Sequence, residues 1–214
     1  MRRFTRRSFR LVKERFAHQI SITSLTAAGR STLLQRLKRT FAGTPYRFVS
    51  GGEMMRRRAQ ELDMTIEEFA RFNREHPEDG HDRWCDDEIA RMAKLNWLIG
   101  EGRLTHIFMP RAFHVLLTCP VQERARRRHA QLRAQLGRKC PRYEKVVVDI
   151  LRRDDDDAAR YEEMYPGCMW KPEDFDAVID TKAHDEAEVE NIVHHIHRQW
   201  LAELTEKNII RRAA

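Results

Sequence analysis

The chain has 214 residues, of which 41% are hydrophobic and 34% are charged, with a formal net charge of +7 and a mean hydropathy of −0.70. The hydrophobic residues recur in periodic blocks, which excludes a disordered polypeptide and predicts one domain with a single core. No apolar run approaches the roughly 20 residues that span a bilayer, and the N-terminus lacks the apolar segment of a secretory signal. We therefore expect a cytoplasmic protein without a membrane partner, whose positive charge favours nucleotides or nucleic acids.

The N-terminal segment, residues 1–17, is a basic arm with seven Lys or Arg residues among its first sixteen positions. Such an arm either contacts nucleic-acid phosphates or serves as a solubilising tail, and both alternatives stay open. We set it apart from a domain at 18–206 and from a short tail at 207–214.

Alternating and amphipathic patterns predict a regular succession of strands and helices behind the arm. In chain order, they are a strand at 19–23, a helix at 30–41, a strand at 46–50, helices at 52–63, 66–75 and 82–95, strands at 96–101 and 112–119, helices at 121–135 and 142–164, a strand at 176–180 and a helix at 185–206. Strands separated by helices predict a parallel sheet with helices on both faces and ligands beyond the carboxyl ends of the strands.

Local signals support two of these helices. Thr65 followed by Glu68 forms a capping-box pattern at the start of the helix 66–75. In the helix 30–41, residues Leu33, Leu34 and Leu37 recur at the spacing of a buried face.

Neither the cysteines nor the histidines form a strong metal motif. Four widely separated cysteines predict reduced thiols with structural roles; they are Cys85, Cys119, Cys140 and Cys168. In "HHIH" (194–197), His194 and His197 would share a helix face, either as metal ligands or as part of a plain helix. The lack of a second cluster favours the plain helix.

The segment "SLTAAGRST" (24–32) lies between the first strand and the first helix, where a phosphate-binding loop belongs. Against the pattern G-x-x-x-x-G-K-[ST] it keeps Gly29 and the hydroxyl of Ser31, whereas Ser24 replaces a glycine and Arg30 replaces the lysine. Such a loop wraps backbone N–H groups around phosphates and adds a cation and a hydroxyl. Taken alone, the segment is equally readable as a turn that Thr26 or Ser31 caps.

Three further motifs follow the loop in order: "SGGEMMR" (50–56), "EGR" (101–103) and "RDDDDAAR" (153–160). Their order and spacing resemble the cytidylate kinase-like branch of the nucleoside monophosphate kinases, and the resemblance runs from about residue 19 to 204. It implies a three-layer α/β/α P-loop kinase fold with a central parallel sheet, a helical monophosphate-binding segment at 52–95 and a lid at 137–168. It also implies transfer of the γ-phosphate of ATP to CMP or dCMP with Mg²⁺.

The resemblance assigns site residues motif by motif. ATP binding falls on the loop residues Ser24, Thr26, Ala27, Ala28, Gly29, Arg30, Ser31 and Thr32. Acceptor binding falls on Ser50, Gly51, Arg56, Asp82, Arg83 and Arg103. The family's lid pattern R-D-x-x-D-x-x-R is met by Arg153, Asp154, Asp157 and Arg160.

Phosphoryl transfer needs alignment and charge neutralisation rather than covalent chemistry, so arginines should dominate the site. Arg30, Arg153 and Arg160 are the candidate catalytic residues. Ser31 is a candidate Mg²⁺ ligand, and Glu101 either orients Mg²⁺ through water or pairs with Arg103. We expect the run of aspartates at 154–157 to tether arginines while the lid is open.

The sequence leaves three functions open: an active nucleoside monophosphate kinase, a catalytically impaired nucleotide-binding relative, and a nucleic-acid-binding protein on a kinase fold. The altered loop motivates the second hypothesis. Ala27 replaces a family glycine, and its Cβ disfavours a positive φ. The planar head of Arg30 does not occupy a lysine's place without a shift.

Overall fold

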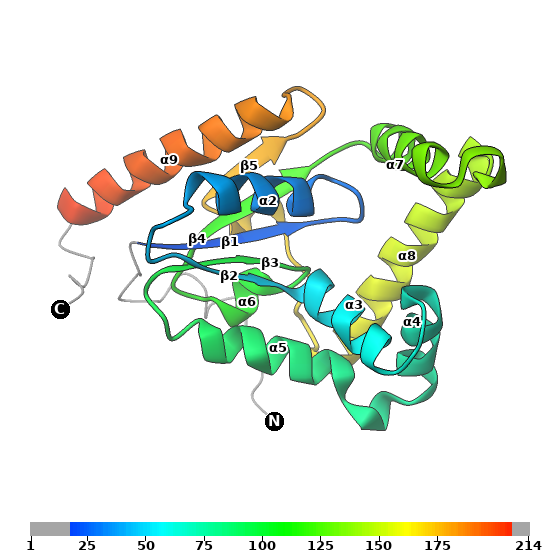
Figure 1. Ribbon diagram of the computed structural model, residues 1–214. Helices are drawn as coiled ribbons and strands as arrows, with labels where there is room; N and C mark the ends of the chain where they lie inside the picture. The colour runs from blue at the N-terminus through cyan, green and yellow to red at the C-terminus, as the bar shows by residue number, and fades with distance from the viewer. Residues whose placement is uncertain (1–17, 207–214) are drawn as a thin grey trace.

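The computed structural model describes residues 18–206, so the arm at 1–17 and the tail at 207–214, with the hypotheses attached to them, lie outside the described residues. Within that range, parallel strands form one sheet in the order β2-β3-β1-β4-β5 (Figure 1). The strands are β1 (Gln19–Ser24), β2 (Arg47–Ser50), β3 (Leu98–Glu101), β4 (Phe113–Thr118) and β5 (Ala177–Asp180).

Helices connect and flank the strands. They are α2 (Arg30–Thr40), α3 (Gly51–Glu61), α4 (Ile66–Glu75), α5 (His81–Met92), α6 (Thr105–Phe108), α7 (Val121–Leu136), α8 (Tyr143–Met164) and α9 (Glu186–Glu206). Short 3-10 turns follow α4, α7 and α8. They are η1 (Pro77–Asp79), η2 (Gly137–Lys139) and η3 (Pro172–Asp174). Among the described residues, no helix is long and apolar enough to cross a membrane.

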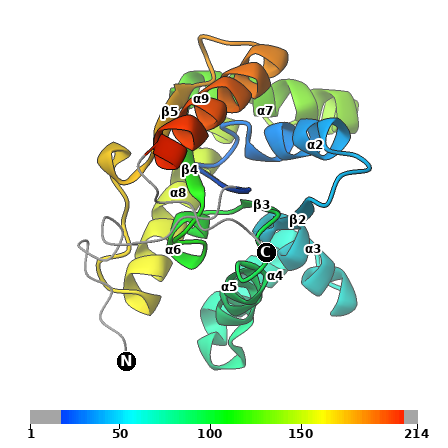
Figure 2. The ribbon, with the colours of Figure 1, turned by 90° about the vertical axis from the view of Figure 1, so that its left-hand side faces the viewer.

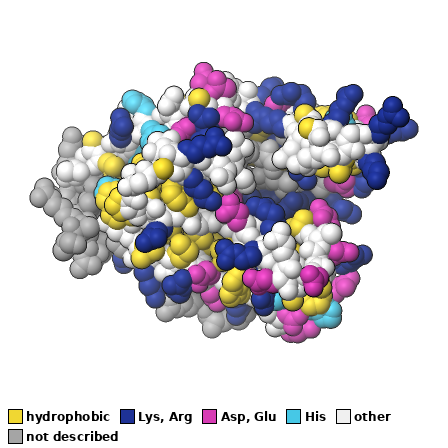
Figure 3. Space-filling view, in the orientation of Figure 1, with side chains coloured by type: hydrophobic (Ala, Val, Ile, Leu, Met, Phe, Trp, Pro, Cys, Tyr) yellow, Lys and Arg dark blue, Asp and Glu magenta, His cyan; other side chains and the backbone are white. Residues whose placement is uncertain are grey.

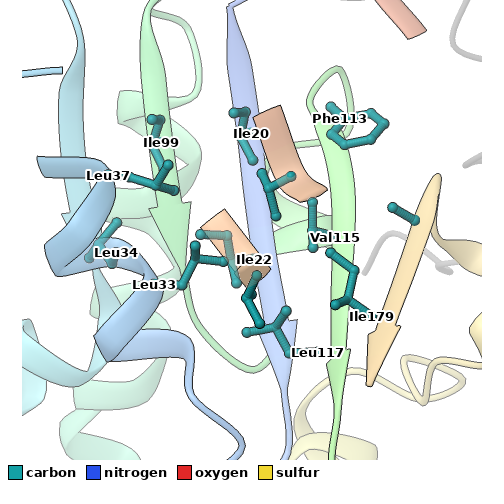
Figure 4. Close-up of a cluster of buried hydrophobic side chains, with 13 residues drawn as sticks. Ile20, Ile22, Leu33, Leu34, Leu37, Ile99, Phe113, Val115, Leu117 and Ile179 are labelled. Atoms are coloured by element: carbon teal, nitrogen blue, oxygen red, sulfur yellow. The ribbon is translucent and has the colours of Figure 1, made fainter. Parts of the chain in front are cut away.

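The sheet is the middle layer of a three-layer α/β/α arrangement, as the sequence predicts. Helices α2 and α9 cover one face, and α5 and α6 lie on the other (Figures 1 and 2). The predicted inward residues of α2 pack on Ile20 and Ile22 of β1 (Figure 4). These helix residues, Leu33, Leu34 and Leu37, are fully buried, so the predicted face is confirmed.

Strand β1 occupies the centre of the sheet, between β3 and β4. The chain leaves β1 towards β2 on one side, returns to β3, and then crosses to β4 on the other side. Such a reversal opens a crevice beyond the carboxyl end of the central strand. The loop 24–29 lies at that point, so the topology itself selects this loop as part of a binding site.

Two helix starts differ in a way that matters for the site. The capping box at α4 is confirmed, because Thr65 and Glu68 satisfy each other's backbone N–H groups. Helix α2 instead begins after Gly29 without a side-chain cap, so neither Thr26 nor Ser31 caps it. The interpretation of 24–32 as a capped turn is therefore wrong.

The segment between β3 and β4 was not fully predicted. It contains the short helix α6, which buries His106 against Phe175, with ring centroids 5.0 Å apart. Helix α6 folds under the sheet, where His106 lies beside Thr23. Burial lowers the pKa of His106 to about 3, so its imidazole is neutral.

Candidate functional site

The loop after β1 curls through two left-handed backbone positions. Gly29 has φ +104°, where a glycine is expected, but Ala27 has φ +59°. A residue with a Cβ is destabilised in this conformation by roughly 1 kcal/mol. The predicted conflict at position 27 is thus present, and the surrounding contacts hold Ala27 in the strained conformation.

A cavity of about 670 Å³ lies against this loop and the N-terminus of α2. We call it the loop cavity; the loop residues 24–33, Thr181 and residues 184–186 line it, together with Arg103, Arg127, Arg128 and Arg153. The unoccupied N–H groups at a helix start and the surrounding guanidinium groups favour an anion. Every predicted ATP-binding residue borders this cavity.

A second cavity, of about 460 Å³, lies among α3, α4, α5 and α8, and we call it the α4 cavity. Thr26, Arg30 and Arg103 line both cavities, so the two spaces meet at the loop. The molecular surface is hollowed between the lobe of α7 and the lobe of α3 and α4, with Lys and Arg side chains along its edges (Figure 3). Two adjoining cavities that share arginines at their junction suit a reaction between two phosphorylated ligands.

Arg30 stands at the junction of the cavities, where its Nε lies 3.2 Å from Oε2 of the buried Glu101. The other carboxylate oxygen of Glu101 accepts a hydrogen bond from the Ser50 hydroxyl. Nη1 of Arg30 has no hydrogen-bond partner among the described residues. Arg30 is therefore oriented by one side of its guanidinium group, while the other side remains able to bind an anion.

The alternative in which Glu101 pairs with Arg103 is wrong, because Glu101 pairs with Arg30 and Arg103 with Asp154 and Asp157. Glu101 ends β3 opposite Ser50 of β2 and Ile22 of β1, and this register directs its carboxylate to the start of α2. Arg103 lies two residues further on and extends to the other side of the loop. Both oxygens of Glu101 have a partner among the described residues, and its role beside Mg²⁺ through water stays a prediction.

The side chain of Asp154, on α8, lies at the centre of a buried ionic cluster. Its Oδ1 accepts hydrogen bonds from the Thr26 backbone N–H at 3.0 Å and from Arg103 at 2.9 Å, and its Oδ2 accepts one from Arg124 at 2.6 Å. Burial opposes the negative charge, but the Arg124 and Thr26 hydrogen bonds and the Arg103 charge outweigh it and lower the pKa of Asp154. The carboxylate of Asp154 thus accepts a hydrogen bond from a backbone N–H of the loop.

Arg124 was missed from the sequence, where it is one of several arginines on α7. It is nearly fully buried, and it also donates to the Thr26 carbonyl at 2.9 Å. A signal was present, because Arg124 falls one turn after Val121 on the stripe that continues to Ala125 and Leu132. An arginine within a buried stripe requires an acidic partner, and Asp154 is that partner.

A second ionic chain extends from the loop into the α4 cavity. Asp157 bonds Arg103 at 2.7 Å and Arg160 at 2.8 Å, and Arg160 in turn lies 3.3 Å from Asp82 on α5. The expectation that the aspartate run tethers arginines agrees with these contacts. The tethered arginines, however, include Arg103 and Arg124, which lie outside the lid.

The remaining predicted residues lie at different depths. Ser50 and Gly51 are buried beside Arg30, and Arg153 is exposed at the border of both cavities. Arg56 is exposed over Gly52, and Arg83 is exposed and is not among the residues that line either cavity.

The two candidate metal sites, at Ser31 and at His194 with His197, have different surroundings. The Ser31 hydroxyl is exposed in the loop cavity, where it can complement the phosphate and water oxygens that Mg²⁺ prefers. His194 and His197 instead pack on Phe41 and Phe113. Among residues 18–206, no group of three or more His, Cys, Asp or Glu side chains is placed to hold a metal ion.

We predict that Asp154→Ala destabilises the fold by about 3–5 kcal/mol, because it leaves buried guanidinium groups without their counter-charge. Urea denaturation measures the loss, and inorganic phosphate should raise the melting temperature of this variant more than that of the wild type. The exposed neighbour supplies the control, since Asp155→Ala should change stability by less than about 0.5 kcal/mol. Equal stability of the two variants would show that the cluster is not structural.

We predict a pH-dependent effect of Asp86→Asn. Burial, reinforced by Asp82 and opposed by the hydrogen bond from Tyr165, raises the pKa of Asp86 to about 7. The native state therefore binds a proton that the unfolded state has lost, and stability falls as the pH rises from about 4 to about 7.

Asparagine mimics the neutral carboxyl, so the advantage of Asp86→Asn over the wild type should grow between pH 5 and pH 8, by at most about 1.4 kcal/mol per pH unit. Denaturation midpoints at several pH values measure it, with the exposed Asp87→Asn as control. A constant difference across this range contradicts the assignment.

Comparisons with known proteins agree with this geometry. A cytidylate kinase of Methanothermobacter thermautotrophicus is 33% identical over 167 residues, which cover 78% of this chain and 96% of that protein. A cytidylate kinase of Thermococcus kodakarensis is 28% identical over 163 residues, which cover 76% of this chain and 78% of that protein.

Solved structures of low sequence identity share the fold alone. A gluconokinase from Sinorhizobium meliloti matches with a TM-score of 0.54 at 14% identity, covering 91% of this chain and 99% of that one. A shikimate kinase from Aquifex aeolicus matches with a TM-score of 0.51 at 14% identity, covering 83% and 95%. The family model described as "Cytidylate kinase" matches residues 84–199, more than half of the chain. The sequence resemblance is confirmed, and the chain belongs to the cytidylate kinase family.

Proposed function

We propose that this protein transfers the γ-phosphate of ATP to CMP or dCMP with Mg²⁺, in the cytoplasm. The observation that carries the proposal is the junction of the two cavities at Arg30 and Arg103. In-line transfer requires the donor and acceptor phosphates to meet at one point, and this junction is where the site concentrates its positive charge.

In the proposed mechanism, ATP occupies the loop cavity with its phosphates against the start of α2. Backbone N–H groups and Arg30 bind the phosphates, and Ser31 would contact the Mg²⁺ that neutralises their charge and orients them. The ion pair with Glu101 holds the guanidinium group of Arg30 in a fixed orientation. Preorganised cations of this kind stabilise the transferred group without reorganising during the reaction.

The acceptor occupies the α4 cavity with its phosphate towards the junction. Arg103 and Arg160 line this cavity and are held by Asp157, so they present a fixed pair of guanidinium groups. Arg56 and Arg83 would reach the acceptor only from the exposed rim. The segment 137–168 acts as the lid, with the exposed Arg153 closing over both phosphates and excluding water that would hydrolyse ATP.

A nucleotide-binding relative with impaired catalysis is the second candidate, and two observations favour it. Ala27 holds a strained backbone conformation, and Asp154 occupies the Thr26 N–H that a phosphate oxygen would use. Both features weaken ATP binding at the loop. Measurement of turnover decides between this candidate and the active kinase.

We predict ADP release that depends on CMP or dCMP and exceeds release with UMP or AMP, in a coupled assay with ATP and Mg²⁺. Replacing Arg30 with alanine should lower kcat by roughly 100-fold, because it removes a preorganised cation at the junction. Arg126→Ala is the matched control, since Arg126 is exposed on α7 and pairs with Glu123. The proposal fails if no acceptor raises ADP release above ATP hydrolysis.

We predict that Ala27→Gly stabilises the fold by roughly 0.5–1 kcal/mol and tightens ATP binding, because glycine adopts φ +59° without a Cβ penalty. Calorimetry with ATP and thermal unfolding provide the two readouts. Asp63→Gly is the control, because Asp63 also has a positive φ, of 53°, but does not border the loop cavity. A tighter ATP complex in both variants would mean that loop strain is not the cause.

A further inference from the structure

Asn73 on α4 is a buried polar residue whose hydrogen-bonding groups are unused. Its residue surface is 6% exposed, it lines the α4 cavity, and neither Oδ1 nor Nδ2 has a hydrogen-bond partner among the described residues. Native proteins rarely leave both groups of a buried amide unpartnered, because the desolvation is uncompensated. A flip of the amide changes nothing, since both atoms are unpaired.

The position of Asn73 on its helix is itself unusual. It falls one turn after the fully buried Phe69 and two turns after Ile66, on the stripe that α4 directs into the protein. Packing alone favours an apolar residue at this place. A polar side chain that interrupts such a stripe, beside a cavity, points to recognition of a ligand.

The surroundings of Asn73 indicate the chemistry of that ligand. Arg30 and Arg103 line the α4 cavity at its junction with the loop cavity, and Arg160 lines it beside Asp82. Apolar surface comes from Ile66, Phe69, Ala70, Val146 and Ile150. A phosphate suits the cationic groups, and a flat heterocycle suits the apolar surface. Binding sites of this kind are mostly apolar, with a few polar groups that fix orientation.

We propose that Asn73 is a specificity-determining residue that hydrogen-bonds the edge of the acceptor base through both amide atoms. This inference rests on the proposed function and deepens it. With cytosine, Oδ1 accepts from the 4-amino group and Nδ2 donates to ring nitrogen N3. Side-chain amides bind adenine by the same bidentate pairing of a donor and an acceptor.

The charge of the cavity favours cytosine over uracil in this role. The carboxylate of Asp82, which pairs with Arg160, borders the same space, and an ionised carboxylate only accepts hydrogen bonds. An exocyclic amino group supplies donors to such surroundings, whereas the 4-carbonyl of uracil does not. Asn73 thus pairs with the base while the neighbouring carboxylate of Asp82 favours the amino-bearing pyrimidine.

The test is Asn73→Leu, which keeps a similar volume and removes both amide atoms. Calorimetry should show a roughly tenfold weaker affinity for CMP, as expected for the loss of a base contact. In the coupled assay, KM for CMP should rise with kcat unchanged at saturation. The affinity for ribose 5-phosphate, which has no base, should stay the same.

A structural role of Asn73 predicts a different outcome. If Asn73 only supports the fold, Asn73→Leu lowers the melting temperature and weakens CMP and ribose 5-phosphate binding together, which overturns the proposal. We expect instead an unchanged or higher melting temperature, because no hydrogen bond of the free protein is lost. Asn73→Ser provides a second, smaller variant, and the exposed Arg71→Ala on the same helix is the control.

The proposed function and the role of Asn73 are tested by different outcomes. If the wild-type protein binds neither CMP nor any other nucleoside monophosphate, the proposed function fails and this inference fails with it. If the wild type binds CMP and both Asn73 variants bind it equally well, only the role of Asn73 is overturned.

Discussion

The carboxylate of Asp154 is the contact on which the site depends, because it compensates guanidinium groups that the fold has removed from water. Arg124 comes from α7, Arg103 from the end of β3, and the Thr26 N–H from the loop. A buried cation without its counter-charge is strongly unfavourable, whereas a shared carboxylate satisfies all three donors at once. This carboxylate therefore links the loop, α7 and α8, which also share an apolar cluster of Ala27, Ala125 and Val146.

The same helix that supplies Asp154 also orders the acceptor side. Asp157 lies one turn further along α8 and bonds Arg103 and Arg160, so a single rigid element contacts both cavities. Arriving phosphates would add negative charge beside these carboxylates and compete for their arginines. An arginine that leaves its aspartate would then be available to a phosphate. The aspartate run thus supplies the counter-charge for these arginines in the ligand-free protein.

Much of this architecture was predictable from the sequence, for reasons that also explain the failures. Hydrophobic period and strand–helix alternation fixed the layers, and the position of the loop after the first strand located the crevice. Partner choice was not predictable, because Glu101 selects Arg30 through strand register rather than sequence distance. Arg124 was not distinguished from the other arginines of its helix, and helix α6 was missed because four residues carry too little periodicity. Asn73 was invisible for a related reason, since burial without a partner is a property of the folded cavity.

The conflict between the loop and the rest of the site bears directly on catalysis. Ala27 stores strain that a glycine would relieve, and the fold tolerates it because Arg124 binds the Thr26 carbonyl while Thr181 binds the Ala28 carbonyl. The loop is therefore held from both sides of position 27, and its shape does not rely on glycine. Arg30, oriented by Glu101, keeps one side of its guanidinium group unpaired at the junction. The altered positions 27 and 30 thus lie in a loop that tertiary contacts hold in place, and the proposed function requires this loop to bind a phosphate in that conformation.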